Sequence, residues 1–129
     1  MSFHLLLINW LNNSLTKKYT LLATITDTTT GKSHAVPDMS KYSEIGFILY
    51  SNSGCGELKT YPYEILATLN GDATTNSSSR PFISMTQIQG NISNHISALL
   101  SVKSSTSIMV EAISVNGYWT FNKLEIYGK

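Results

Sequence analysis

The sequence predicts an all-β, jelly-roll-like antiparallel sandwich of about seven or eight strands. Only 13% of the 129 residues are charged, and Ser, Thr and Asn supply much of the polarity. These residues favour strands and turns, because Thr is stiff at χ1 and Ser and Asn compete for backbone hydrogen bonds. Runs rich in β-branched and aromatic residues alternate with turn signals. We expect one β domain over residues 19–129.

Residues 1–18 differ from the rest and predict an apolar arm or a short helix. Phe3, Leu7 and Trp10 recur at helical spacing, although an extended strand fits nearly as well. The apolar run 5–11 is too short to span a membrane and lacks a basic flank and a small-residue cleavage site. We expect this arm to make an oligomer contact without membrane insertion.

Residues 19–69 predict three strands, at 19–26, 43–51 and 61–69. Gly, Pro and Asp residues between them supply turn chemistry. These strands are expected to cover the apolar face of a second sheet.

Residues 82–127 predict that second sheet, a four-stranded antiparallel meander. Gly90 and Asn91 suit a type II′ hairpin, and residues 104–106 suit a three-residue loop. The predicted pairs in these two hairpins are Met85 with Ile96, Ile83 with Ala98, Val102 with Ile108, Leu100 with Val110 and Ala98 with Ala112.

Asn116 and Gly117 predict a C-terminal hairpin, because this pair is preferred in two-residue type I′ turns. A bulge near Asn122 would keep the apolar residues on one face. The predicted pairs are then Val110 with Leu124, Ile108 with Ile126 and Glu111 with Lys123. The shared interior is predicted to hold Ile96, Leu100, Ile108, Val110, Phe121 and Ile126, with Trp119 also turned inward.

Charge and cysteine content exclude several classes of protein. The net charge is +1, and no basic patch is visible, so nucleic-acid binding is not expected. Cys55 is the only cysteine, so stability has to come from packing and sheet hydrogen bonds rather than from an intramolecular disulfide.

No catalytic residue is predicted. The eight carboxylates are scattered without a motif spacing. A glycosidase needs only two carboxylates close in space, so a pairing of Asp38 with Glu44 or Glu64 stays open. Residues 53–56 resemble part of a nucleophile loop, but the full elbow pattern and the following helix are missing.

No metal or cofactor is predicted either. His4, His34 and His95 lie on separate segments, outside the short spacings of zinc motifs. Convergence of dispersed histidines on a three-fold axis between subunits remains an alternative.

A recognition surface is the remaining expectation. Tyr rings with a hydroxyl suit sugar rings, and binding residues often lie on loops of a rigid scaffold. The predicted ligand-binding residues are Tyr118, Asn116, Asp38, Tyr61, Tyr63, Asn52 and Asn76.

Residues 19–129 resemble the C-terminal receptor-binding head domains of phage and prophage fibre proteins. The resembling segments are 19–26, 36–38, 42–50, 108–113, 116–118 and 124–128. The resemblance implies a compact β-sandwich head, usually trimeric, that binds host cell-surface saccharide without a cofactor. No stalk segment is recognised, and no binding residue of the family carries over by position.

The expected function is therefore that of a non-enzymatic virion adhesin, made in the bacterial cytoplasm and acting outside the cell at the tip of a phage fibre. Its expected partners are host glycan, other virion proteins and two further copies of itself. A structural virion component, such as a head decoration or baseplate connector, is the alternative. A small polysaccharide-degrading enzyme is a third hypothesis.

Overall fold

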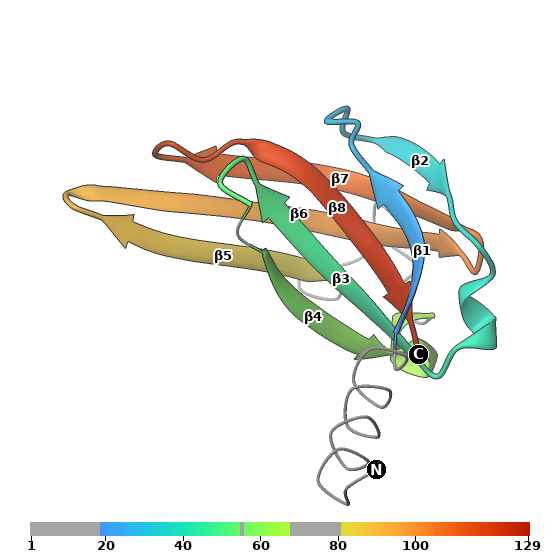
Figure 1. The fold of residues 1–129 in the computed structure, drawn as a ribbon. Coiled ribbons are helices and arrows are strands. Elements are labelled where there is room, and N and C mark those ends of the chain that lie inside the picture. The colour runs from blue at the N-terminus through green and yellow to red at the C-terminus, as the bar shows by residue number, and fades with distance from the viewer. Residues whose placement is uncertain (1–18, 55, 68–80) are drawn as a thin grey trace, which may run out of the picture.

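The computed structural model describes residues 19–54, 56–67 and 81–129, which form two four-stranded antiparallel sheets packed face to face (Figure 1). The strands are β1 (Thr20–Ile25), β2 (Lys32–Ala35), β3 (Glu44–Ser51), β4 (Gly56–Pro62), β5 (Phe82–Gln89), β6 (Ile92–Ser104), β7 (Ser107–Asn116) and β8 (Phe121–Gly128). Sheet A has the order β1-β8-β3-β4, and sheet B has the order β2-β7-β6-β5. The predicted all-β sandwich is confirmed.

Two short helices complete the described chain: η1 (Met39–Lys41) and α2 (Tyr63–Leu66). The predicted arm at residues 1–18 lies outside the described residues. No helix within 19–54, 56–67 and 81–129 is long and apolar enough to cross a bilayer.

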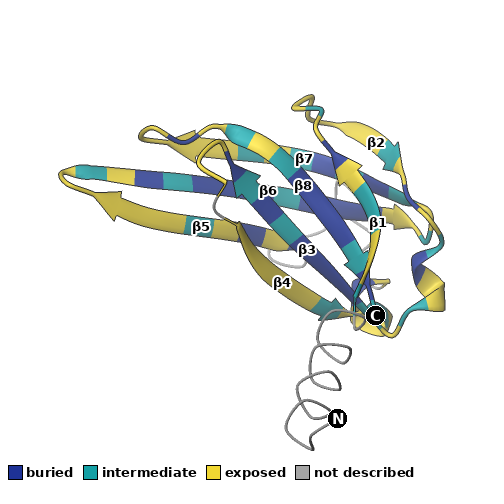
Figure 2. Cartoon of the chain, in the orientation of Figure 1, coloured by how far each residue is buried: buried dark blue, intermediate teal, exposed yellow. Residues whose placement is uncertain are grey.

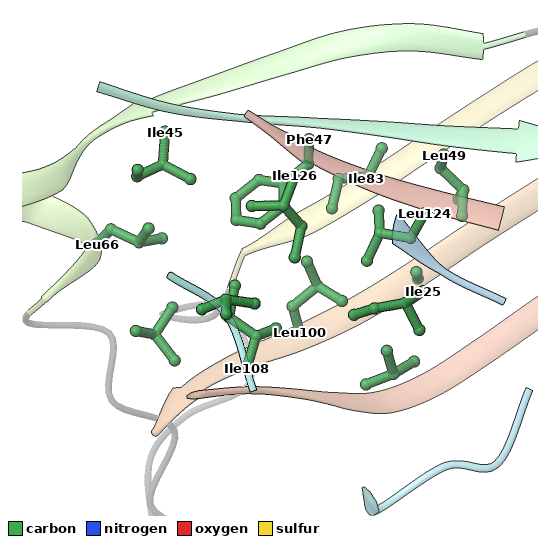
Figure 3. Close-up of a cluster of buried hydrophobic side chains, with 14 of the residues drawn as sticks. Ile25, Ile45, Phe47, Leu49, Leu66, Ile83, Leu100, Ile108, Leu124 and Ile126 are labelled. Atoms are coloured by element: carbon green, nitrogen blue, oxygen red, sulfur yellow. The ribbon is translucent and has the colours of Figure 1, made fainter. Parts of the chain in front are cut away.

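The core lies between the two sheets and is built mainly from inward-facing residues of β3, β6, β7 and β8 (Figures 2 and 3). Phe47 and Leu124 of sheet A and Leu100 of sheet B are almost completely buried. Five of the predicted interior residues are 0% exposed, namely Ile96, Leu100, Ile108, Val110 and Ile126. Phe121 is only partly buried against this cluster, whereas Trp119 is buried as predicted.

The first three predicted strands are only partly correct. Strands at 19–26 and 43–51 correspond to β1 and β3. The strand predicted at 61–69 is wrong, because α2 follows directly after β4 and buries Leu66 in the core. β2 was not predicted, since its sequence Lys32–Ala35 is short and carries only one apolar residue. β1 and β3 do lie in the sheet that covers sheet B, as predicted, but β8 joins them there and the unpredicted β2 joins sheet B.

The two predicted hairpins of sheet B are confirmed in their main features. Met85 pairs with Ile96, and Gly90 has φ 61° with Asn91 outside the positive region, as a type II′ turn requires. Val102 pairs with Ile108, and the intervening turn leaves two residues between Ser104 and Ser107 instead of three.

The register of β6 and β7 changes at Glu111, so the predicted pair Ala98 with Ala112 is wrong. Ala98 pairs with Ile113, because a bulge leaves Glu111 unmatched between Val110 and Ala112. At this bulge Glu111 accepts a 2.6 Å hydrogen bond from the hydroxyl of buried Ser101. This bond satisfies a polar group that sequence alternation does not reveal.

The predicted C-terminal hairpin is wrong, because β7 and β8 lie in different sheets (Figure 1). Gly117 has φ 70°, but Asn116 does not have a positive φ, so the turn is not type I′. Leu124 pairs with Leu49 and Ile25 instead of Val110. Consequently the predicted pairs of Ile108 with Ile126 and of Glu111 with Lys123 are also absent.

The connection between β7 and β8 is directed across the sandwich by buried groups. The side-chain oxygen of Asn94, which is 0% exposed, accepts a 2.8 Å hydrogen bond from the Tyr118 N–H. Its amide nitrogen donates to Gln89 at 3.3 Å. Trp119, the next residue, inserts into the core. With Tyr118 and Trp119 held in this way, the chain crosses from β7 in sheet B to β8 in sheet A.

The predicted bulge at Asn122 does occur, but opposite a different strand. Tyr50 pairs with Lys123 and Ser51 pairs with Phe121, which leaves Asn122 unmatched against β3. Alternation in β8 thus predicted the position of the bulge although the neighbouring strand is β3 and not β7.

We predict that Asn94→Ala lowers the free energy of unfolding by about 1–3 kcal/mol, because it removes a fully buried amide and leaves the part-buried Tyr118 N–H without its acceptor. Asn116→Ala is the matched control, since the exposed Asn116 amide makes only a 3.5 Å bond to the Ser93 carbonyl. Its loss should cost less than about 0.5 kcal/mol. Urea unfolding followed by circular dichroism measures both, and equal losses would contradict the assigned role of Asn94.

Candidate functional site

The structure brings Asn52, Asn116 and Tyr118 together at one end of the sandwich. The Asn52 amide is engaged by the loop itself: it donates to the Tyr118 carbonyl at 3.2 Å and accepts from Thr120 N–H at 3.0 Å. The Tyr118 side chain is 65% exposed. Because Asn52 holds the loop backbone, Tyr118 is the predicted residue at this end with a largely free side chain.

Asp38, Tyr61 and Tyr63 lie toward the opposite end, where β3 begins and β4 ends, and each has a structural contact. Asp38 accepts from the Ser40 N–H and hydroxyl at 3.0 and 2.6 Å, so it caps η1, and these bonds hold the pKa of its carboxyl below the ordinary value. Tyr61 packs edge-on against Phe47 at 6.1 Å. Tyr63 packs against the core. Asn76 lies outside the described residues.

The residues considered for catalysis and metal binding do not form a common site in the described part of the chain. Glu44 accepts a hydrogen bond from Tyr19, whereas Glu64 is exposed on α2. His95 contacts Thr86, while His34 lies on β2, and His4 falls outside the described segments. Among the described residues, no group of three or more His, Cys, Asp or Glu side chains could hold a metal ion.

Three tyrosines lie close together on the outer face of sheet A. We call the surface that they form the tyrosine face. It consists of Tyr19 before β1, Tyr50 on β3, Tyr127 on β8, and the aliphatic residues Ile48 and Leu58. Strand pairing brings these residues together, because Tyr127 lies opposite Gly46, and Ile48 lies between Glu125 and Leu58. Tyr19, Ile48, Leu58 and Tyr127 line an open hollow of about 250 Å³.

Two glycines shape this face. A Cβ on Gly46 would lie 2.8 Å from Leu58 Cδ1 and 3.6 Å from the Tyr19 ring. A Cβ on Gly56 would lie 2.8 Å from the ring of Tyr50, its cross-strand partner. Glycine at these positions therefore lets the neighbouring side chains lie down on the sheet, an arrangement used elsewhere to protect glycines in strands.

The polar groups of the tyrosine face are paired with one another. Glu125, only 9% exposed, receives hydrogen bonds from Tyr50 and Tyr127, and Lys123 lies 4.0 Å from its carboxylate. The Tyr19 hydroxyl donates to Glu44 at 2.7 Å. Two buried or half-buried carboxylates thus orient three tyrosine hydroxyls.

This pairing changes the acidity of the tyrosines. Burial, followed by the hydrogen bond to Glu125, raises the pKa of Tyr50 to about 12. Burial and the bond to Glu44 likewise raise the pKa of Tyr19 to about 12, and the same bond lowers the pKa of Glu44. The hydroxyls therefore stay neutral and can act as hydrogen-bond groups over the physiological pH range.

Two lysines complete the face. Lys123 Nζ lies 4.8 Å from the centre of the Tyr50 ring, and Lys129 Nζ lies 5.8 Å from that of Tyr19. Lys129 also lies 3.6 Å from Glu44. Positive and negative groups alternate at short range, so this surface favours no strongly charged ligand.

A second concavity of about 210 Å³ lies between the edges of β4 and β5, lined in part by Glu57, Lys59, Phe82 and Ser84. It lacks the grouped tyrosines of the outer face. Its lining is more polar than apolar, and we assign it no ligand.

Comparison with protein-family models, curated proteins and solved structures gives no match to this chain.

Sequence reasoning missed the tyrosine face. Alternation along the strands indicates which side chains face outward. In β3, Ile48 and Tyr50 alternate with the buried residues Phe47 and Leu49. In β8, Tyr127 follows the buried Ile126. Alternation assigns these residues to an outer face. It does not bring β3 and β8 together, because their pairing joins segments far apart in the chain.

We predict that stability falls as the pH rises from about 10 to about 12. Tyr50 and Tyr19 have folded-state pKa values of about 12, above the ordinary value near 10, so the folded protein holds their protons more tightly. The stabilisation is complete below about pH 10 and is lost as the pH passes through the folded pKa.

Urea unfolding at a series of pH values measures this fall, and Tyr50→Phe should make it shallower because phenylalanine does not titrate. An identical pH dependence in the two proteins would show that the Tyr50 hydroxyl is not held as described.

Proposed function

We propose that this chain is a non-enzymatic saccharide-binding head, which binds glycan through the tyrosine face. The observation that carries the proposal is the grouping of Tyr19, Tyr50 and Tyr127 on one rigid sheet, with hydroxyls oriented by Glu44 and Glu125. Tyrosine rings offer an apolar face to the C–H groups of a sugar and a hydroxyl to its polar edge. Such groups are already ordered, so little freedom is lost on binding.

The size of the hollow favours an extended glycan over an enclosed small molecule. About 250 Å³ is below the ~300–1,000 Å³ of pockets that enclose drug-sized ligands. A sugar ring seated between Tyr19 and Tyr127 would lie on Ile48 and Leu58, and its neighbours in the chain would extend over the sheet toward Tyr50. The balanced charges of this surface fit a neutral saccharide, whose binding depends little on salt.

The biological setting we propose is the tip of a phage fibre, with host cell-surface saccharide as the ligand. This rests on the resemblance of residues 19–129 to fibre head domains, together with the tyrosine face. It implies that the protein acts on the virion, outside the cell in which it is made.

A structural virion component is the second candidate, favoured by the exposed side chains of Leu21 and Leu58. They are 49% and 42% exposed; Leu58 belongs to the tyrosine face, and Leu21 lies beside it, opposite Tyr127. Exposed apolar groups beside aromatic rings also suit a contact with another virion protein. In that case the same surface would bind protein and retain no glycan.

The first experiment is a glycan array probed with the intact chain, followed by calorimetric titration with the best-retained neutral oligosaccharide. Tyr127→Ala should weaken binding about tenfold, because covering roughly 56 Å² of apolar ring surface contributes ~1.4 kcal/mol, which is tenfold in affinity. Chromatography should recover the ligand intact, whereas a hydrolase would shorten it.

Tyr118→Ala is the matched control, since Tyr118 is an exposed tyrosine at the loop end of the sandwich. It should leave affinity unchanged. Loss of binding in Tyr118→Ala but not in Tyr127→Ala would move the site to the loops, and retention of no glycan would favour the structural virion component.

A further inference from the structure

The four edge strands of the sandwich differ in how they are protected from pairing with another chain. β1 is interrupted by a bulge between Leu21 and Ala23. β2 has only four residues and carries Lys32. β4 carries Glu57 and Lys59. Bulges, short length and charge are the usual means of preventing edge-to-edge association.

β5 has none of these protections. Its eight residues contain no charged residue and no proline, and its pairing with β6 runs without a bulge. Phe82 and Ile88 on its outer face are 49% and 75% exposed. The β5–β6 hairpin projects beyond β3 and β4, and no other strand of the described residues pairs with this edge (Figure 1).

The main-chain groups on this edge can be assigned from the hairpin. Gln89 and Ile92 flank the two-residue turn and form a hydrogen-bonded pair, so odd-numbered residues of β5 direct their N–H and C=O to β6. Even-numbered residues direct them outward. The Phe82 N–H agrees, since it donates to the Tyr61 hydroxyl at 3.2 Å instead of to β6.

The outward groups without a strand partner in the described chain belong to Ser84, Thr86 and Ile88. This row of unpaired main-chain groups is bounded at one end by Phe82, whose N–H donates to the Tyr61 hydroxyl. At the other end it is bounded by the turn at Gly90. The three residues are spaced evenly about Thr86. An antiparallel copy of the same strand therefore matches them group for group.

We propose that β5 is a homotypic interface, which pairs antiparallel with β5 of a second copy about a two-fold axis at Thr86. Thr86 lies opposite Thr86, and Ser84 lies opposite Ile88. The second copy is the occupant, because its β5 is an edge strand without charge, and like pairs with like across a two-fold contact. Two four-stranded sheets B then form one continuous sheet of eight strands.

This interface is independent of the saccharide site, because no residue of the tyrosine face lies on β5. It also differs from the three-copy assembly that the fibre-head resemblance implies, since a two-fold contact produces pairs. The two assemblies are separated by molar mass.

Light scattering on the full chain should give twice the 14.2 kDa of one chain. Thr86→Lys should return the mass to that of one chain, because it sets two ammonium groups directly opposite each other. Circular dichroism checks that the variant folds. A trimer, a monomeric native chain, or a dimer unchanged by Thr86→Lys would overturn the proposal.

Two matched variants control for other effects. Thr86→Val removes the 3.1 Å contact with His95 but keeps a β-branched residue, so the dimer should persist. Ser33→Lys adds the same charge to β2, the other edge of sheet B, and should also leave the dimer intact.

Disulfide trapping tests the register. In a Cys55→Ser background, Thr86→Cys should form an intermolecular disulfide, since paired Cα atoms ~5.5 Å apart are within disulfide reach. Ser84→Cys should not, because its equivalents are four residues out of register, about 13 Å apart. Faster trapping through Ser84→Cys would overturn the register centred on Thr86.

Discussion

The position of β8 between β1 and β3 is the constraint on which the rest of the structure depends. This strand is the last in the described chain, yet it occupies the interior of sheet A, where it pairs along both edges. Leu124 and Ile126 point into the core and are 0% exposed. Removing β8 would leave β1 without a partner in its sheet and open the core along its full length.

The same strand connects stability to the proposed function. Residues that alternate with the core positions of β8 form the centre of the tyrosine face, with Tyr127 beside Gly46 and Glu125 beside Ile48. Because Leu124 and Ile126 are locked in the core, the residues between them have little freedom. Glu125 then orients the hydroxyls of Tyr50 and Tyr127. The face is therefore held in place by the packing beneath it.

The two ends of the sandwich have a different role. Amides at the loop end, from Asn52 and Asn94, are used to hold the connection between β7 and β8. At the other end Asp38 caps η1. Asn and Asp residues in loops suggested ligand contacts, but their short polar side chains are equally suited to bonding nearby main-chain groups. In this protein the rigid sheet, more than its loops, carries the grouped aromatic and carboxylate side chains.

Local sequence determined the all-β class, the strands β1 and β3, and the two hairpins of sheet B, because alternation and turn residues act between near neighbours in the chain. Alternation in β8 also predicted the bulge at Asn122. Only the tertiary structure decided three features: the sheet that contains β8, the helix after β4, and the tyrosine face. Asn116 and Gly117 permit a hairpin, but burial of Trp119 and the bond from Tyr118 to Asn94 favour a crossing. These contacts join residues distant in sequence, so no local pattern contains them.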